Sequence, residues 1–167
     1  MPGGHGRKRE LDPRLGEGFT LLETIVVIVI IGIIAVTAAP RMLSMSDLAA
    51  AQAHRKALAD LRFARRLGAS SGCPVRVDFS ASGYTLDQRA SCRTGAFGAP
   101  IADPETNRSP FVATMPSGVA ITSDLDPMIF DELGRVTNDA GTVFDATVSV
   151  GGRTISAVGE TGLVRAL

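Results

Sequence analysis

The sequence contains no tryptophan and one tyrosine, and aromatic residues make up only 5% of its 167 residues. This scarcity excludes an aromatic platform on which single-stranded nucleic acid could stack. The chain also has no excess of charge, because 17 Lys and Arg balance 17 Asp and Glu. A strongly basic nucleic-acid-wrapping protein and an acidic solvating chain are therefore excluded as descriptions of the whole molecule.

Catalytic and metal-binding motifs are missing as well. The sequence has no phosphate-cradling glycine loop, no HExxH pair and no nucleophile elbow. Its two histidines, His5 and His54, lie far in sequence from its two cysteines, so a metal site is not indicated. Four acidic residues lack the spacing of a calcium loop and are typical of a solvated turn: Asp124, Asp126, Asp131 and Glu132. We expect neither enzymatic activity nor a bound cofactor or metal ion.

One long segment carries no charge at all, from Ile25 to Ala39. Counted from Phe19, the apolar segment has 21 residues, and as a helix it would be about 31 Å long, which matches the apolar core of a bilayer. Basic residues before it favour a cytoplasmic N-terminus. The alternative is a cleaved secretory signal, but the segment is long for one and Pro40 makes a poor cleavage site. A single membrane anchor with the remaining chain outside the cytoplasm is the favoured interpretation.

Glu23 is the one ionisable residue within this apolar segment. An ionisable group in a membrane helix is costly, and the cost decreases near the interface. Glu23 could therefore simply reach the cytoplasmic headgroups, or it could pair with a cation. A cut between Gly18 and Phe19 would create such a cation, because the new α-amino group would lie four residues from the carboxylate.

Residues 18–23 have the sequence GFTLLE and are followed by a membrane-length run of Ile and Val. This combination resembles the class III signal of type IV prepilins and type II secretion pseudopilins. The resemblance implies that prepilin peptidase removes a leader, residues 1–18, by cleaving after Gly18, and that Phe19 is then N-methylated. It also implies assembly into a helical filament through the N-terminal helix, with Glu23 and Pro40 as assembly residues. The leader is longer than many in the family, and Thr24 stands where many members carry Leu.

The rest of the chain predicts an α+β protein of the type IV pilin kind, with a long N-terminal helix followed by an antiparallel β-sheet head. We expect a transmembrane and assembly helix over residues 19–40, with a bend or local melting near residues 36–40 caused by Pro40. A second, amphipathic helix is expected over residues 41–72, ended by Gly68, Gly72 and Pro74. Small residues at helical spacing predict the buried face of this helix: Ala50, Ala53, Ala57, Leu61, Ala64 and Gly68.

Residues 73–167 change to a period of two and form the expected β-rich head. Residues 75–79 and 84–87 predict a hairpin, and residues 89–110 are typical of a long loop. Further short strands are expected at residues 111–114, 119–122, 128–130, 142–150 and 153–158. Gly151 and Gly152 form the turn expected between the last two.

Within this head, CPVRV (residues 73–77), IFD (129–131) and GR (134–135) resemble the GspH/FimT group of minor pilins and pseudopilins. AVTAAPR (35–41), SGC (71–73) and RASC (89–92) are most similar to MshC-type minor pilins of MSHA pili. The resemblance implies a low-copy subunit that primes or caps a type IV pilus or a type II secretion pseudopilus. Its expected location is the bacterial inner membrane, with the head in the periplasm, and its expected partners are prepilin peptidase, other pilins or pseudopilins, and membrane lipid.

Cys73 and Cys92 lie on the side of the membrane segment that is expected to be outside the cytoplasm. In an oxidising compartment a lone pair of cysteines most simply forms a disulfide. Two buried free thiols are the alternative.

A second function, DNA capture during natural transformation, is known among FimT-like minor pilins. The basic candidates for phosphate contact are Arg62, Arg65, Arg66 and Arg165. The C-terminal segment has one arginine where DNA-binding relatives tend to carry more, so DNA is the less favoured partner.

Overall fold

The computed structural model describes residues 20–167, without the side chains of residues 36–44. The expected cleavage positions, Gly18 and Phe19, therefore lie outside the described residues. The chain divides into two compact units that meet between Arg41 and Met42, and each unit is described by itself. Within the described residues, no helix is both long enough and apolar enough to span a membrane.

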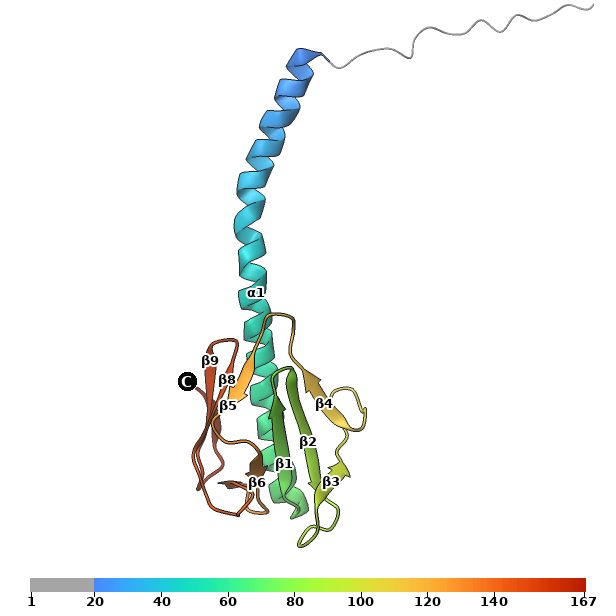
Figure 1. Ribbon diagram of the computed structural model, residues 1–167, viewed down its shortest axis with the longest axis vertical. Helices are drawn as coiled ribbons and strands as arrows, with labels where there is room; N and C mark the ends of the chain where they lie inside the picture. The colour runs from blue at the N-terminus through green and yellow to red at the C-terminus, as the bar shows by residue number, and fades with distance from the viewer. Residues whose placement is uncertain (1–19) are drawn as a thin grey trace, which may run out of the picture. The chain divides into compact units, whose positions relative to one another are not determined.

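One helix, α1 (Leu21–Ser71), contains both helical segments that the sequence predicts (Figure 1). It is helical without a break at Pro40, so of the two effects expected near residues 36–40, a bend or local melting, the melting is wrong. A proline removes one backbone donor, and in this helix the turns on either side remain formed. The helix ends where the sequence indicates, because Gly72 adopts a positive φ of 65° and Pro74 follows.

Gly68 does not end the helix as expected, because α1 continues for three further residues. It is buried against the end of a strand instead. A Cβ atom at this position would lie 3.0 Å from the backbone oxygen of Asp131 and 3.1 Å from that of Phe130. Glycine is thus required at position 68 for close packing rather than for terminating the helix.

The first sheet has six antiparallel strands, with the order β3-β2-β1-β6-β7 and β4 paired to β2. The predicted hairpin is confirmed, with Ser80 opposite Gly83 at its turn. The strands of this sheet are β1 (Val75–Ser80), β2 (Gly83–Arg89), β3 (Phe97–Pro100), β4 (Phe111–Thr114), β6 (Met128–Phe130) and β7 (Val136–Thr137).

The second sheet has four antiparallel strands in the order β10-β9-β8-β5. Gly151 and Gly152 form the tight turn between β8 and β9, as predicted. The strands of this sheet are β5 (Ile121–Ser123), β8 (Ala146–Val150), β9 (Arg153–Ala157) and β10 (Val164–Ala166).

Three strands were not expected, and each lies at the end of its sheet, paired with the strand that precedes it in sequence. Strand β3 lies within the expected loop, and the Phe97 ring packs against the guanidinium groups of Arg76 and Arg89 at 5.1 and 4.9 Å. Strand β7 pairs with β6, and β10 pairs with β9. Two expected strands are shorter or shifted, because β8 begins at Ala146 and β5 begins at Ile121.

Both sheets contribute to one core with the second half of α1. The small-residue face of the helix is buried as predicted, and Ala57, Leu61 and Ala64 are at most 1% exposed. Small side chains let the sheets approach the helix closely, while the strands supply the large apolar groups. The structure thus confirms an α+β fold with a long helix and an antiparallel head.

Candidate functional site

Thr20 and Glu23 form the start of α1. The Glu23 backbone N–H donates to the Thr20 hydroxyl oxygen at 3.2 Å, which satisfies one of the free donors at a helix N-terminus. Thr and Glu at this spacing form the sequence pattern of a capping box. The negative charge of Glu23 in the first turn also complements the helix dipole. Glu23 therefore has a local role in addition to the two that the sequence suggests.

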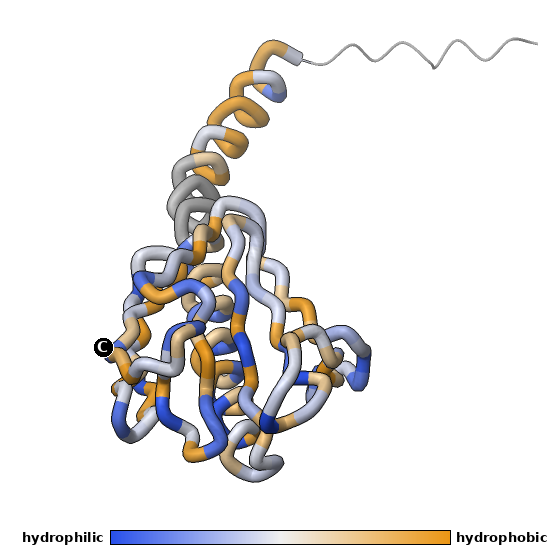
Figure 2. The backbone as a smooth tube through the Cα atoms, turned by 60° about the horizontal axis from the view of Figure 1, so that its bottom comes forward, coloured by the Kyte–Doolittle hydropathy of each residue, from blue (hydrophilic) through white to orange (hydrophobic). Residues whose placement is uncertain are grey.

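The turns that follow consist mostly of hydrophobic residues (Figure 2). Every large apolar residue from Leu21 to Ile31 is between 45% and 78% exposed. A soluble helix normally buries one apolar stripe, and a helix that is apolar all round belongs in a protein core or a membrane. This segment, which we call the assembly segment, is therefore the main candidate site for binding other molecules.

A disulfide joins Cys73 and Cys92, as the sequence predicts. Cys73 is buried directly after α1, whereas Cys92 is exposed in the loop that follows β2. The bond connects the end of the helix to this loop, so it restrains the end of the head at which α1 terminates.

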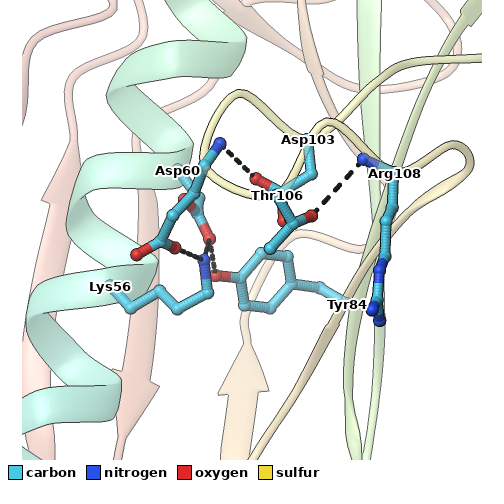
Figure 3. A network of polar contacts seen from close by, with 7 residues as sticks. Lys56, Asp60, Tyr84, Asp103, Thr106 and Arg108 are labelled. Atoms are coloured by element: carbon cyan, nitrogen blue, oxygen red, sulfur yellow. Dashed lines mark hydrogen bonds and ion pairs between the residues drawn. The ribbon is translucent and has the colours of Figure 1, made fainter.

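A polar network attaches the loop after β3 to the helix (Figure 3). The Lys56 ammonium lies 3.3 Å from the Asp60 carboxylate and 3.0 Å from the Glu105 carboxylate. The Tyr84 hydroxyl donates to Asp60 at 2.6 Å. Within the loop, the Asp103 carboxylate accepts from the Glu105 backbone N–H at 2.8 Å and from the Thr106 hydroxyl at 2.9 Å.

The environment of this network shifts the pKa values of its members. Burial raises the pKa of the Asp60 carboxyl, although the Tyr84 hydrogen bond and the Lys56 charge act in the opposite direction. Burial and the Asp60 charge raise the pKa of the Tyr84 phenol far above its ordinary value. For Lys56, burial lowers the pKa, but contacts with Glu105 and Asp60 outweigh it and the net shift is upward. The network has a structural role, because its members bind one another and attach the loop after β3 to α1.

Two of the four arginines considered for DNA contact hold the C-terminal segment against α1. Arg62 donates from Nε to the Val164 carbonyl oxygen at 3.0 Å, and Arg65 donates from Nη2 to the Thr161 carbonyl oxygen at 2.9 Å. Arg66 and Arg165 are exposed. Two of the four arginines predicted to contact phosphate thus bind backbone carbonyl groups of the head instead.

The acidic residues of the suspected turn stabilise the backbone. Asp124 accepts from the Thr147 N–H, Asp126 from the Phe79 N–H, and Asp131 from the Leu133 and Arg135 N–H groups. Among the described residues, no group of three acidic, histidine or cysteine side chains could hold a metal ion. His54 is packed in the head, with Nε2 3.3 Å from the Thr154 carbonyl oxygen.

A depression of about 810 Å³ on the head lies beside the disulfide. Its lining carries positive and negative side chains in equal number, three arginines and three acidic residues: Arg89, Arg93, Arg135, Asp131, Glu132 and Asp139. Asp131 and Arg135 already form an ion pair at 2.8 Å. This balance of charge does not form a binding site for a polyanion.

No protein-family model and no curated protein matches the chain. Two solved structures with a similar fold are both of the minor pseudopilin EpsH from the type II secretion system of Vibrio cholerae. The first is 15% identical, with a TM-score of 0.54 over 71% of this chain and 95% of the EpsH chain. The second is 17% identical, with a TM-score of 0.55 over 74% of this chain and 98% of the EpsH chain. The chain has the fold of a minor pseudopilin.

Proposed function

We propose that the protein is a minor pseudopilin that assembles through the assembly segment into a type II secretion pseudopilus. The observation that carries the proposal is the combination of a minor-pseudopilin head with helical turns whose apolar side chains are uncovered on all sides. The similarity to EpsH favours the secretion pseudopilus over an MSHA-like type IV pilus. The subunit would be present in few copies and prime or cap the filament.

The assembly segment requires two environments in turn. Burial of apolar surface is worth about 25 cal/mol per Å², so exposure of these side chains to water is strongly unfavourable. Before assembly, residues 19–40 would span the bacterial inner membrane and contact lipid, with the head in the periplasm. After assembly, neighbouring pilin-type helices would cover the same side chains. The disulfide of the head supports an oxidising compartment.

Processing would prepare the segment for assembly. In this proposal prepilin peptidase cleaves between Gly18 and Phe19, and Phe19 is N-methylated. The Thr20 hydroxyl then caps a helix that begins two residues after the new N-terminus. The Glu23 carboxylate would pair with the Phe19 amine of its own or a neighbouring subunit, and Pro40 would lie at the end of the membrane-spanning residues 19–40.

Incorporation of an Ile28→Asp variant into filaments tests the proposal. Ile28 is 64% exposed in the assembly segment, and Val112, on β4 of the head, is 54% exposed. Val112→Asp is therefore a matched control that adds the same charge outside the helix. We expect the wild type and Val112→Asp, but not Ile28→Asp, in filaments sheared from cells and detected by immunoblot. Equal incorporation of Ile28→Asp would contradict the proposal.

A further inference from the structure

The face of α1 that points away from the two sheets changes in character along the head. Its exposed positions alternate at spacings of three and four residues: Met45, Leu48, Gln52, Arg55, Ala59, Arg62, Arg66 and Ala69. We call these eight residues the outer stripe. Met45 and Leu48, at its N-terminal end, are 68% and 55% exposed. Three arginines follow further along it, Arg55, Arg62 and Arg66, so the stripe changes from apolar to basic along the helix.

The three arginines of the outer stripe carry uncompensated charge. Within the described part of the chain, the ion pairs involve other residues, and none includes Arg55, Arg62 or Arg66. The acidic residue nearest to them along the helix, Asp60, is buried and paired with Lys56. Because the whole chain has no net charge, this concentration of positive charge on one helix face is a local feature.

The spacing of the arginines describes a partner that could match them. Arg55 and Arg62 are seven residues apart, or about 10 Å along the helix axis, and Arg62 and Arg66 are four residues apart, or about 6 Å. A second helix packed along the stripe, with carboxylates at the same intervals, could pair with all three guanidinium groups. An alternation of three and four is also the spacing at which helices pack side by side.

We propose that the outer stripe binds an acidic helix of a neighbouring pilin-type subunit, with apolar contacts at Met45 and Leu48 and ion pairs at the three arginines. This inference rests on the proposed filament function and adds the chemistry of the partner. The apolar residues at the start of the stripe favour a helix over DNA, which offers phosphates but no apolar surface of this kind. Arg62 also donates its Nε–H to the Val164 carbonyl oxygen within the head.

Cross-linking in cells that assemble filaments tests this proposal with the full chain. A photoreactive residue replaces Ala59, which lies between Arg55 and Arg62 on the stripe. We expect an adduct with another filament subunit, mapped to a helical segment that carries Asp or Glu at intervals of seven and four. The double variant Arg55→Glu/Arg66→Glu should reduce the adduct about tenfold, because two attractive pairs become repulsive. Reversing the charges of the mapped acidic residues should restore it.

Arg93→Glu is the matched control, because Arg93 is an exposed arginine outside α1, in the loop between β2 and β3. It should leave the adduct unchanged. A thermal melt of each variant head checks that folding is intact. If the wild type is in filaments but the double variant cross-links equally well, or if the adduct is with DNA, the docking proposal fails and the filament function stands. Absence of the wild type from filaments would overturn both.

Discussion

At the scale of single residues, Glu23 has two separable roles. Its side chain occupies the Glu position of the capping box that begins at Thr20, and its carboxylate is the proposed partner of the Phe19 amine. Each charge alone is costly in a bilayer, and pairing recovers part of that cost. A partner on a neighbouring subunit exists only in the filament, so the pair would favour one axial offset between adjacent helices.

Two substitutions at Glu23 separate these roles. Glu23→Ala should leave leader cleavage nearly intact but reduce incorporation into sheared filaments at least about tenfold, since loss of a charge pair in an apolar setting costs over 1.4 kcal/mol. Glu23→Gln retains a side chain suited to a capping box but no charge, so it should fail in the same way. Rescue by Gln would assign Glu23 to helix capping instead.

The raised pKa of Asp60 predicts that the free energy of unfolding of the head depends on pH in the acidic range. Its pKa is raised by burial, so the folded protein holds this proton more tightly than the unfolded chain does. Its contribution to the free energy of unfolding therefore falls as the pH rises from about 4, the ordinary value, through the raised pKa of the folded state. Denaturant unfolding across a pH series should show this fall in the wild type and not in Asp60→Asn.

Tyr84→Phe provides the contrasting variant. It removes the hydrogen bond that lowers the pKa of Asp60, so the pKa should rise further and the fall in stability should extend to higher pH. The variant should also lose about 1–3 kcal/mol of stability near neutral pH, the usual cost of an unmet buried hydrogen bond. Parallel pH profiles in all three proteins would contradict this account of the network.

At the scale of elements, close contact between α1 and β6 depends on Gly68. A methyl group there would meet two backbone oxygens that cannot move aside as a side chain can. We expect Gly68→Ala to destabilise the head by about 1–3 kcal/mol, despite the gain of up to about 1 kcal/mol in helix propensity. Thermal unfolding measures the change, and Gln52→Ala, on the exposed face of the same helix, should stay within about 0.5 kcal/mol of wild type. A more stable Gly68→Ala head would refute the packing role.

The disulfide holds the loop after β2 at the end of α1. It closes a loop with a sequence separation of 19 residues, for which the chain-entropy model gives about 3 kcal/mol of stabilisation. The double variant Cys73→Ala/Cys92→Ser should lose about this amount in denaturant unfolding. Leader cleavage should be unaffected, because it occurs on the other side of the membrane in our proposal. Alkylatable thiols in unreduced wild-type protein would contradict the bond.

At the scale of the whole molecule, local sequence pattern predicted most of the helix and strands, and pairing between strands accounts for the strands that it missed. The period of the small residues on α1 and the alternation in β1 and β2 depend only on near neighbours, and both predicted the correct burial. Strands β3 and β10 have only four and three residues, too few to show a clear period of two, and each depends on pairing with the strand before it. The burial of Asp60 could not be predicted from its neighbours, because its partner, Tyr84, is 24 residues away.

The candidate site follows a similar division. The uncharged run after residue 23 and the two cysteines could be assigned from the sequence, and the structure shows the exposed helix and the bond. The roles of Arg62 and Arg65 could not be assigned, because their acceptors are backbone carbonyls about one hundred residues away. The cap at Thr20 had a local signal, Thr followed three residues later by Glu, and it could have been predicted from the capping-box pattern.

The central claim is that this chain is a processed subunit of a secretion filament, and mass spectrometry of sheared filaments tests it most directly. We expect the filament fraction to contain the chain beginning at Phe19, with one methyl group on its amine and a disulfide between Cys73 and Cys92, in far fewer copies than the main subunit. A chain that retains residues 1–18, or one confined to fractions without filaments, would contradict the claim.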